Sequence, residues 1–220
     1  MHKGIIFDFD GVIAESVQVK SDAFAEIYSP FGNDVVQKVL SHHKANGGMS
    51  RFEKIKYYHE TFLNQSITEV EITKLTNLFS EFVIDKVIAT SYVPGALEYI
   101  QKCHEKCKLF ISTGTPTDEM KQILTGRKIA HYFSDVFGSP DKKVIHIKSI
   151  LSKYGMRPEE LLFYGDSNTD LGAATFHDIR FVLRLHECNQ KHFTDFNGPT
   201  IQNFISLDIN TLLSNESVNY

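Results

Sequence analysis

The chain of 220 residues contains no tryptophan, few prolines and no strong excess of charge of either sign. Its net charge of −4 provides no electrostatic attraction for nucleic acid or for an anionic membrane. It has no apolar run long enough to span a bilayer, and its N-terminus lacks the basic and apolar regions of a signal peptide. We expect a cytoplasmic protein that binds neither nucleic acid nor membranes and that is a monomer or a weak homodimer.

Cysteine is also scarce, with only Cys103, Cys107 and Cys188. Cys103 and Cys107 are four residues apart with His104 between them. A zinc site would need a second Cys/His pair at suitable spacing, and none follows. We therefore predict that the three cysteines are reduced structural thiols.

The first apolar segment, KGIIFDF, is short and rich in β-forming residues, which predicts a buried strand. From residue 16 to residue 91, apolar residues recur at helical spacing, with breaks at 30–32, 47–48 and 64–66. No segment typical of a strand interrupts this region. We predict a helical domain over residues 16–91, inserted directly after the first strand of a core formed by residues 1–15 and 92–220.

After Pro94 and Gly95 the pattern changes, and segments typical of helices alternate with segments typical of strands. Strands are predicted in KLFIST, LLFYGDS and IRFVLRL, and an edge strand followed by a loose tail is predicted around GPTIQNFISL. Such alternation favours an α/β fold with a Rossmann-like, doubly wound parallel sheet that is covered on both faces.

Polar side chains follow three of the predicted strands at the point where each strand ends. They are Asp8 and Asp10 after the first strand, Ser112, Thr113 and Gly114 after the second, and Asp166 and Asp170 in YGDSNTD. Side chains two apart on an extended backbone point to the same side, so Asp8 and Asp10 are expected to converge near one point. Because ligands of open parallel sheets bind beyond the carboxyl ends of the strands, these residues predict a site there.

Each of these groups also has a simpler interpretation. Asp10-Gly11 is compatible with a turn, Thr113-Gly114 with an ordinary loop, and DSNTD with a helix N-cap. DSNTDLG also begins like a calcium-binding EF-hand loop, but Leu171 stands where glycine is needed and His177 where glutamate is needed. The coincidence of all the groups at matching strand ends favours a functional site.

Clustered carboxylates repel one another unless a hard cation neutralises them, and Mg²⁺ prefers oxygen ligands. A carboxylate nucleophile beside Mg²⁺ suits phosphoryl transfer, in which a second carboxylate serves as general acid and base. A lysine should balance the charge of the transferring group, and Lys142 and Lys143 in GSPDKK are the candidates.

The strings FDFDGVI, FISTGTP, GSPDKK and YGDSNTD together resemble the four ordered motifs of the haloacid dehalogenase-like hydrolase superfamily. A helical insertion after the first motif is similar to the helical cap of its phosphoglycolate phosphatase and β-phosphoglucomutase-like members. The second aspartate, Asp10, is lacking in the true dehalogenases of the superfamily, so phosphate chemistry is expected rather than cleavage of carbon–halogen bonds.

The resemblance implies a role for each motif residue. It implies that Asp8 is the nucleophile, that Asp10 is the acid/base, and that Thr113 with the Gly114 amide holds the phosphoryl group, Ser112 being a less favoured match. It implies that Lys143 is the phosphate-facing lysine, with Lys142 as the second choice. The implied Mg²⁺ ligands are Asp8, Asp10 (through its backbone carbonyl), Asp166 and Asp170, the last directly or through water.

The loop GGMSR in the helical insertion resembles the Gly-x-Ser-Arg substrate loop of β-phosphoglucomutase-like members. The resemblance implies that Gly48 and Arg51 bind substrate, with Arg51 on a distal phosphate; the alternative is a plain turn with a solvated arginine. We expect His42, His43 and Lys44 to lie on a solvated helix face. Lys54 and Lys56 could line the cleft, but lysines on a helix surface usually have no specific role.

The predicted function is that of a Mg²⁺-dependent phosphatase that acts on a small phosphorylated metabolite through an aspartyl phosphate. A sugar phosphomutase would use the same core and the Arg51 loop, and it remains the first alternative. A non-catalytic binding protein on the same fold is disfavoured because Asp8, Asp10 and Asp166 are all present.

Overall fold

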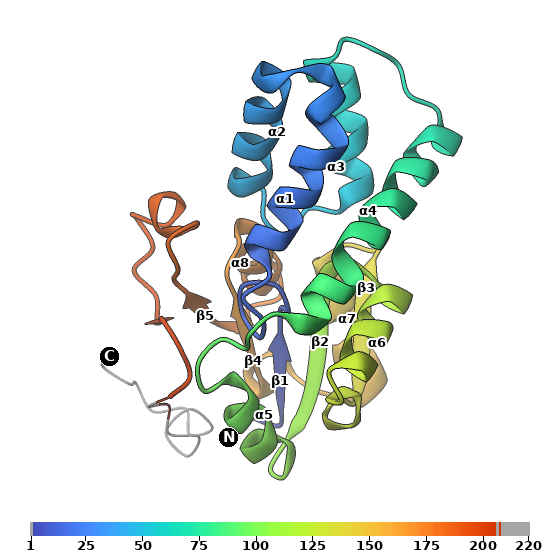
Figure 1. The fold of residues 1–220 in the computed structure, drawn as a ribbon. Coiled ribbons are helices and arrows are strands. Elements are labelled where there is room, and N and C mark those ends of the chain that lie inside the picture. The colour runs from blue at the N-terminus through green and yellow to red at the C-terminus, as the bar shows by residue number, and fades with distance from the viewer. Residues whose placement is uncertain (1, 206, 208–220) are drawn as a thin grey trace.

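A six-stranded, entirely parallel sheet forms the centre of the protein in a computed structural model that describes residues 2–205 and 207. The strand order is β3-β2-β1-β4-β5-β6, so the N-terminal strand lies in the middle (Figure 1). The strands are β1 (Gly4–Phe7), β2 (Lys108–Pro116), β3 (Asp135–Ser139), β4 (Leu161–Gly165), β5 (Arg180–Arg184) and β6 (Thr200–Ile201). The predicted α/β fold with a parallel sheet is confirmed.

Helices cover both faces of the sheet, as the alternation along β1 shows. Ile5 and Phe7 pack into one apolar cluster, whereas Ile6, between them, packs into the other. The first cluster includes residues of α5 (Ala96–His104) and α6 (Thr117–Gly126), and the second includes residues of α7 (Lys143–Tyr154) and α8 (Asn168–Phe176). The sheet is therefore buried on both sides, as its nearly continuous apolar strands predict.

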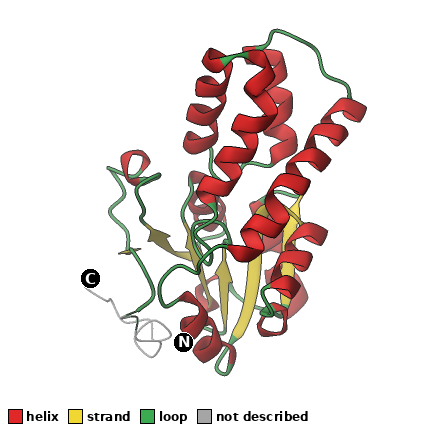
Figure 2. Cartoon of the chain, viewed as in Figure 1, coloured by secondary structure: helices red, strands yellow, loops and turns green. Residues whose placement is uncertain are grey.

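The helical insertion lies between β1 and β2, as predicted. It consists of α1 (Val17–Tyr28), α2 (Asn33–Ala45), α3 (Arg51–Tyr57) and α4 (Glu69–Ala89), with short 3₁₀ and π segments at Ser29–Phe31 and Tyr58–Phe62. Capping side chains set two of these helix starts: Ser50 accepts the Glu53 amide, and Thr68 forms a capping box with Glu71. Figures 1 and 2 show the insertion beyond the carboxyl ends of the strands, where it covers the predicted site.

The remaining short 3₁₀ segments are Ala130–Tyr132, Pro158–Glu160 and Gln190–His192. The predicted edge strand is present as β6, although it is only two residues long. The loose tail expected after it lies outside the described residues. Cys103, Cys107 and Cys188 are free thiols, as predicted. Within residues 2–205 and 207, no helix has the length and apolar character needed to cross a membrane.

Candidate active site

Asp8 follows β1 directly and continues its hydrogen bonding by one residue. Its N–H donates to the Tyr164 carbonyl at 2.9 Å, and its carboxylate Oδ1 accepts the Phe9 N–H at 2.7 Å. The chain then turns at Gly11, whose φ is +73°. A Cβ on Gly11 would lie 2.2 Å from Asp166 Oδ2, so a side chain there would displace that carboxylate. The glycine after the two aspartates is thus required by the turn and by the closeness of Asp166.

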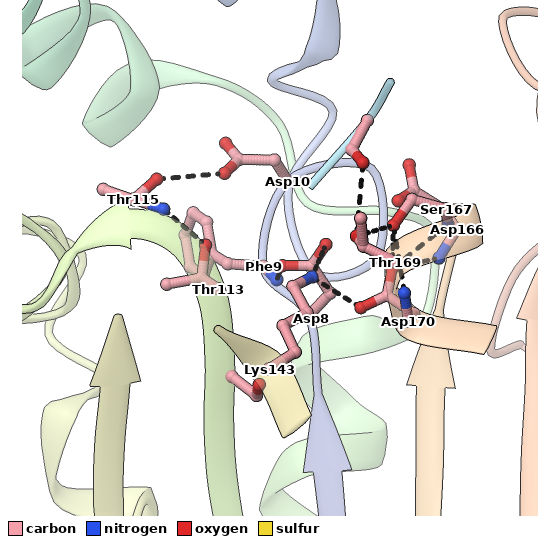
Figure 3. Close-up of polar contacts among 12 residues, drawn as sticks. Asp8, Phe9, Asp10, Thr113, Thr115, Lys143, Asp166, Ser167, Thr169 and Asp170 are labelled. Carbon is pink, nitrogen blue, oxygen red and sulfur yellow. Dashed lines mark hydrogen bonds and ion pairs between the residues drawn. The ribbon is translucent and has the colours of Figure 1, made fainter. Parts of the chain in front are cut away.

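Three carboxylates converge beyond the strand ends. One oxygen each of Asp8, Asp166 and Asp170 lies within 4.8 Å of the others (Figure 3). Lys143 Nζ bridges two of them, at 2.8 Å from Asp8 Oδ2 and 2.5 Å from Asp170 Oδ1. All four side chains are almost completely buried. This cluster brings together three of the four aspartates and the lysine that the sequence predicted.

The two alternative site residues, Lys142 and Ser112, have their contacts outside the acidic cluster. The side chain of Lys142 is 79% exposed and pairs with Glu53 at 3.8 Å, so Lys143 is the lysine beside Asp8. The Ser112 hydroxyl contacts His146 Nδ1 at 3.0 Å, whereas Thr113 lines the cavity above Asp8 with Gly114. The geometry therefore favours Lys143 and Thr113 for the roles that the motifs imply.

Asp170 has two structural partners. Its Oδ2 accepts hydrogen bonds from the Ser167 N–H at 3.1 Å and the Ser167 hydroxyl at 2.5 Å, which closes a capping box at the start of α8. Its Oδ1 faces Lys143. The sequence YGDSNTD thus forms both the helix N-cap and part of the acidic cluster. The cap holds the Asp170 carboxylate in the position from which it contacts Lys143.

The Asp10 side chain points away from the acidic cluster, which corrects the expectation that it converges with Asp8. It accepts hydrogen bonds from Ser16 Oγ at 2.6 Å and from Lys20 Nζ. It also accepts one from Thr115 Oγ1 at 3.3 Å (Figure 3). The reason is that β1 ends at Phe7 and the chain turns, so the alternation of a strand does not continue to Asp10. Both carboxylates nevertheless line the same cavity.

Burial affects the two aspartates differently. It raises the pKa of Asp8 to about 6, although Lys143 opposes the shift. For Asp10, burial also favours the neutral form, but the charge of Lys20 and the hydrogen bonds of Lys20, Ser16 and Thr115 outweigh it and lower the pKa. Asp10 is therefore held as a carboxylate by a cation from the helical insertion.

The acidic cluster fits a divalent cation. Burial raises the pKa of Asp166 and Asp170, and the neighbouring carboxylates add to the increase. Among the described residues, the three carboxylates share Lys143 as their only lysine, so the cluster has more acidic groups than lysines. The donors are all hard carboxylate oxygens, which Mg²⁺ prefers. A bound Mg²⁺ would offset the charge that now raises these pKa values.

The segment after β5 supplies site residues that the sequence-based prediction missed. His186 Nε2 donates to Asp166 Oδ2 at 2.9 Å, and the Asn189 side-chain amide donates to the Asp166 carbonyl at 2.8 Å. Both residues stand in LRLHECNQ, directly after a predicted strand. The argument that polar residues at strand ends meet at one edge of the sheet applies to them equally, and it could have found them.

The glycine loop of the insertion closes directly onto the core. Gly48 has a φ of +73°, and a Cβ there would lie 2.0 Å from Thr169 Oγ1. A Cβ on Gly114 would lie 2.8 Å from the Gly48 carbonyl oxygen, and Thr169 Oγ1 donates to the Gly47 carbonyl at 3.2 Å. Two glycines thus allow the backbones of insertion and core to meet at the roof of the site.

Arg51 is not the solvated arginine of a plain turn, because it is 5% exposed. Its guanidinium donates to Glu119 Oε1 at 2.6 Å and to Ser80 Oγ at 2.9 Å, and it lies 4.5 Å above the centre of the Phe79 ring. Glu119 belongs to α6 of the core, so this pair joins the insertion to the core. Arg51 also lines the cavity, and its contact with a substrate stays a prediction.

One further expectation for the insertion was wrong: His43 does not lie on a solvated helix face but is 7% exposed. Lys54 lines the cavity, which the sequence had left as one of two possibilities; it is 2% exposed, and its Nζ lies 2.9 Å from His43 Nδ1. The reason is that α2 and α3 turn these faces toward Phe24 of α1 and toward the cavity. The cavity has a volume of about 90 Å³, and its wall includes Asp8, Asp10 and Lys54.

Comparison with known proteins agrees with this geometry. Residues 5–184 match the family model described as haloacid dehalogenase-like hydrolase, so the chain belongs to this family of enzymes. A phosphoglycolate phosphatase of Haemophilus influenzae is 25% identical over 183 residues, which cover 78% of this chain and 80% of the relative. Phosphoglycolate phosphatase 1 of Pseudomonas aeruginosa is 24% identical over 207 residues, covering 90% of this chain and 74% of the relative.

Solved structures show the same fold. The β-phosphoglucomutase of Clostridium difficile superposes with a TM-score of 0.77, at 17% identity and with 96% of each chain covered. A haloacid dehalogenase-like hydrolase of Bacillus subtilis, described as bound to magnesium, has a TM-score of 0.66 at 16% identity, covering 92% of this chain and 95% of its own. At these identities the likeness concerns the fold alone.

Proposed function

We propose that the protein is a Mg²⁺-dependent phosphatase that hydrolyses a small phosphorylated metabolite through an aspartyl phosphate on Asp8. The observation that carries the proposal is the buried Asp8 carboxylate, which is oriented by the Phe9 amide and by Lys143 and faces a cavity shared with a second carboxylate, Asp10. The phosphoglycolate phosphatases among its relatives support phosphate monoesters as the substrate class.

In the first step, a carboxylate oxygen of Asp8 attacks the phosphorus atom and forms an O–P bond while the bond to the leaving oxygen breaks. The negative charge of the bound phosphate ester favours uptake of a proton by Asp10, which gives this proton to the leaving oxygen, so the product leaves as an alcohol. Lys143 balances negative charge on Asp8 and on the phosphoryl group, and Thr113 with the Gly114 amide holds the phosphoryl oxygens.

In the second step, Asp10 is a carboxylate and takes a proton from a water molecule. The water oxygen attacks phosphorus, the bond to Asp8 breaks, and inorganic phosphate and the free Asp8 carboxylate are released. The ion pair with Lys20 lowers the pKa of Asp10 and so favours the basic form that this step needs. Asp10 pairs with Lys20 of α1 and therefore lies beside the insertion.

Asp8, Asp166 and Asp170 would hold the metal, and the Asp10 backbone carbonyl is a further ligand by resemblance to the family. When bound, Mg²⁺ acts as a Lewis acid that offsets the negative charge developing on the phosphoryl oxygens. His186 and Asn189 would keep Asp166 in place for this contact, in the manner of groups that orient metal ligands from outside.

The test is a panel of phosphorylated metabolites incubated with the purified protein and Mg²⁺, with released phosphate as the readout. We expect turnover of at least one small monoester by the wild type and none by Asp8→Asn, because an amide cannot form the acyl phosphate. A parallel incubation contains a hexose 1-phosphate with a trace of the bisphosphate. Formation of the isomer without free phosphate would contradict hydrolysis and indicate a phosphomutase instead.

A further inference from the structure

Lys54 is a buried ammonium group that lacks a carboxylate partner among the residues that the structure describes. It is 2% exposed, and its Nζ lies 2.9 Å from the His43 ring nitrogen and 5.9 Å from the centre of the Phe24 ring. The same side chain lines the cavity that contains Asp8 and Asp10. The insertion therefore presents to the space where a substrate would bind an amine that forms no ion pair with the described residues, although Asp10 and Asp166 attract its charge from a greater distance.

Such an arrangement is costly in the empty protein, because a buried charge is tolerated when it is paired and hydrogen-bonded. Two other lysines beside the cavity have such carboxylate partners. Lys143 pairs with Asp8 and Asp170, and Lys20 pairs with Asp10. Lys54 differs from both of them, which indicates that its partner is a group that enters the cavity from outside.

We propose that Lys54 determines substrate specificity by binding a carboxylate of the substrate, so that the enzyme selects small phosphate monoesters that also carry a carboxylate. This inference rests on the proposed phosphatase function and names the part of the substrate that remains outside the phosphoryl site. Lys54 lines the same cavity as Asp8, so the second anion should be carried on the same small molecule as the phosphoryl group.

The position of Arg51 supports Lys54 over Arg51 for this contact. The guanidinium is already neutralised by Glu119 at 2.6 Å and also donates to Ser80, so its charge is used to join α3 to α6. If the Arg51 guanidinium bound the substrate instead, Glu119, which is 6% exposed, would remain as a buried carboxylate without its ion-pair partner. Lys54 can accept an anion without breaking any ion pair of the described residues.

His43 prepares Lys54 for this contact. Burial and the charge of Lys54 keep the pKa of His43 well below its usual value, so the ring is neutral and its Nδ1 accepts one N–H of the ammonium. An ammonium has three donors, so two remain for the oxygens of a carboxylate. Burial and Lys20 lower the pKa of Lys54 to about 7, and an anion bound beside it would favour the charged form again.

The experiment compares two probes that differ only in the second charge, 2-phosphoglycolate and its neutral amide, 2-phosphoglycolamide. We expect the wild type to hydrolyse the acid with a kcat/KM at least tenfold higher than the amide. Lys54→Met should reduce this ratio to about one, mainly through KM for the acid, and Lys54→Arg should retain most of it. Lys56→Met is the matched control, because Lys56 lies on the same helix, is exposed and faces Glu60; its ratio should equal that of the wild type.

Equal kcat/KM for the two probes in the wild type would overturn the role of Lys54 and leave phosphatase activity intact. A ratio that Lys54→Met does not change, or equal losses on both probes, would overturn it as well. Release of phosphate from neither probe and from no other monoester would instead overturn the proposed function. If Lys54→Met does not fold, Lys54→Gln provides the same comparison with a polar side chain of similar length.

Discussion

At the scale of single residues, the sequence predicted which groups surround the site better than it predicted their directions. Asp8, Asp166 and Asp170 meet as expected, because strand ends of a parallel sheet share one edge. The direction of Asp10 depends on a turn at Gly11 and on Lys20, which approaches from the helical insertion. Such a contact joins two elements that are distant in the sequence, so it cannot be predicted from local periodicity.

The roof of the site provides a prediction at Gly48. Gly48→Ala should lower kcat by tenfold or more, because the new Cβ would meet Thr169 Oγ1 at 2.0 Å and hold the insertion away from the core. The left-handed backbone should also cost about 1–2 kcal/mol of stability. Steady-state kinetics and thermal unfolding measure the two effects.

Gly155→Ala is the control for that measurement, since Gly155 has a φ of +60° but no atom within 4 Å of the place that a Cβ would take. It should lose a similar amount of stability and keep its activity. Equal kcat values for Gly48→Ala and the wild type would show that the contact between Gly48 and the core is not needed for turnover.

Lys54 makes stability depend on pH in a defined window. Its pKa is lowered from 10.5 to about 7 in the folded protein, so between these values the unfolded chain binds more protons. The contribution of Lys54 to the free energy of unfolding should therefore rise with pH from about 7 to 10.5, by up to about 1.4 kcal/mol per pH unit.

Urea unfolding of wild type and Lys54→Met at pH 7 and pH 9 tests this, because the other titrating groups are common to both proteins. We expect Lys54→Met to be the more stable protein at pH 7 and its advantage to shrink at pH 9. A constant difference between the two proteins would mean that the ammonium is not destabilised by burial.

At the scale of elements, the apolar periodicity located the helices, and the capping side chains of Ser50, Thr68 and Ser167 mark three of their starts. The sequence could not indicate how the elements are tied together. Arg51 and Glu119 are 68 positions apart, and each is an ordinary residue in its own helix. Their pairing exists only because α3, α4 and α6 come together, and it changes the expected role of Arg51 in stability.

Arg51→Ala should destabilise the protein by about 3 kcal/mol, because it leaves the Glu119 carboxylate buried without its partner. An exposed arginine in a turn would have had almost no effect. Chemical denaturation measures the change, and Lys121→Ala is the control, because its ion pair with Asp118 is exposed and should contribute less than about 1 kcal/mol. A loss for Arg51→Ala no larger than for Lys121→Ala would show that the buried pair contributes little.

At the scale of the whole molecule, the parallel sheet and the insertion were predictable because alternation of helices and strands allows few topologies. The strand order β3-β2-β1-β4-β5-β6 and the close approach of the insertion to the sheet were not in the sequence pattern. The approach of the insertion includes the hydrogen bond from the Thr169 hydroxyl to the Gly47 carbonyl, and the segment after β5 brings His186 to Asp166. The site thus combines predictable strand ends with a roof that only the complete fold defines.

Metal binding should stabilise the whole molecule, because the acidic cluster joins β1, β4 and α8. Mg²⁺ bound there should stabilise the folded state by about 2.7 kcal/mol at a concentration about 100 times its Kd. Thermal unfolding of the EDTA-treated protein with increasing Mg²⁺ should show a rising Tm, and EDTA should abolish turnover that Mg²⁺ restores. Asp166→Asn should lose most of the rise in Tm, whereas Asp141→Asn, outside the cluster, should keep it. Full activity in excess EDTA, or the same rise in Asp166→Asn, would remove this cluster from the mechanism.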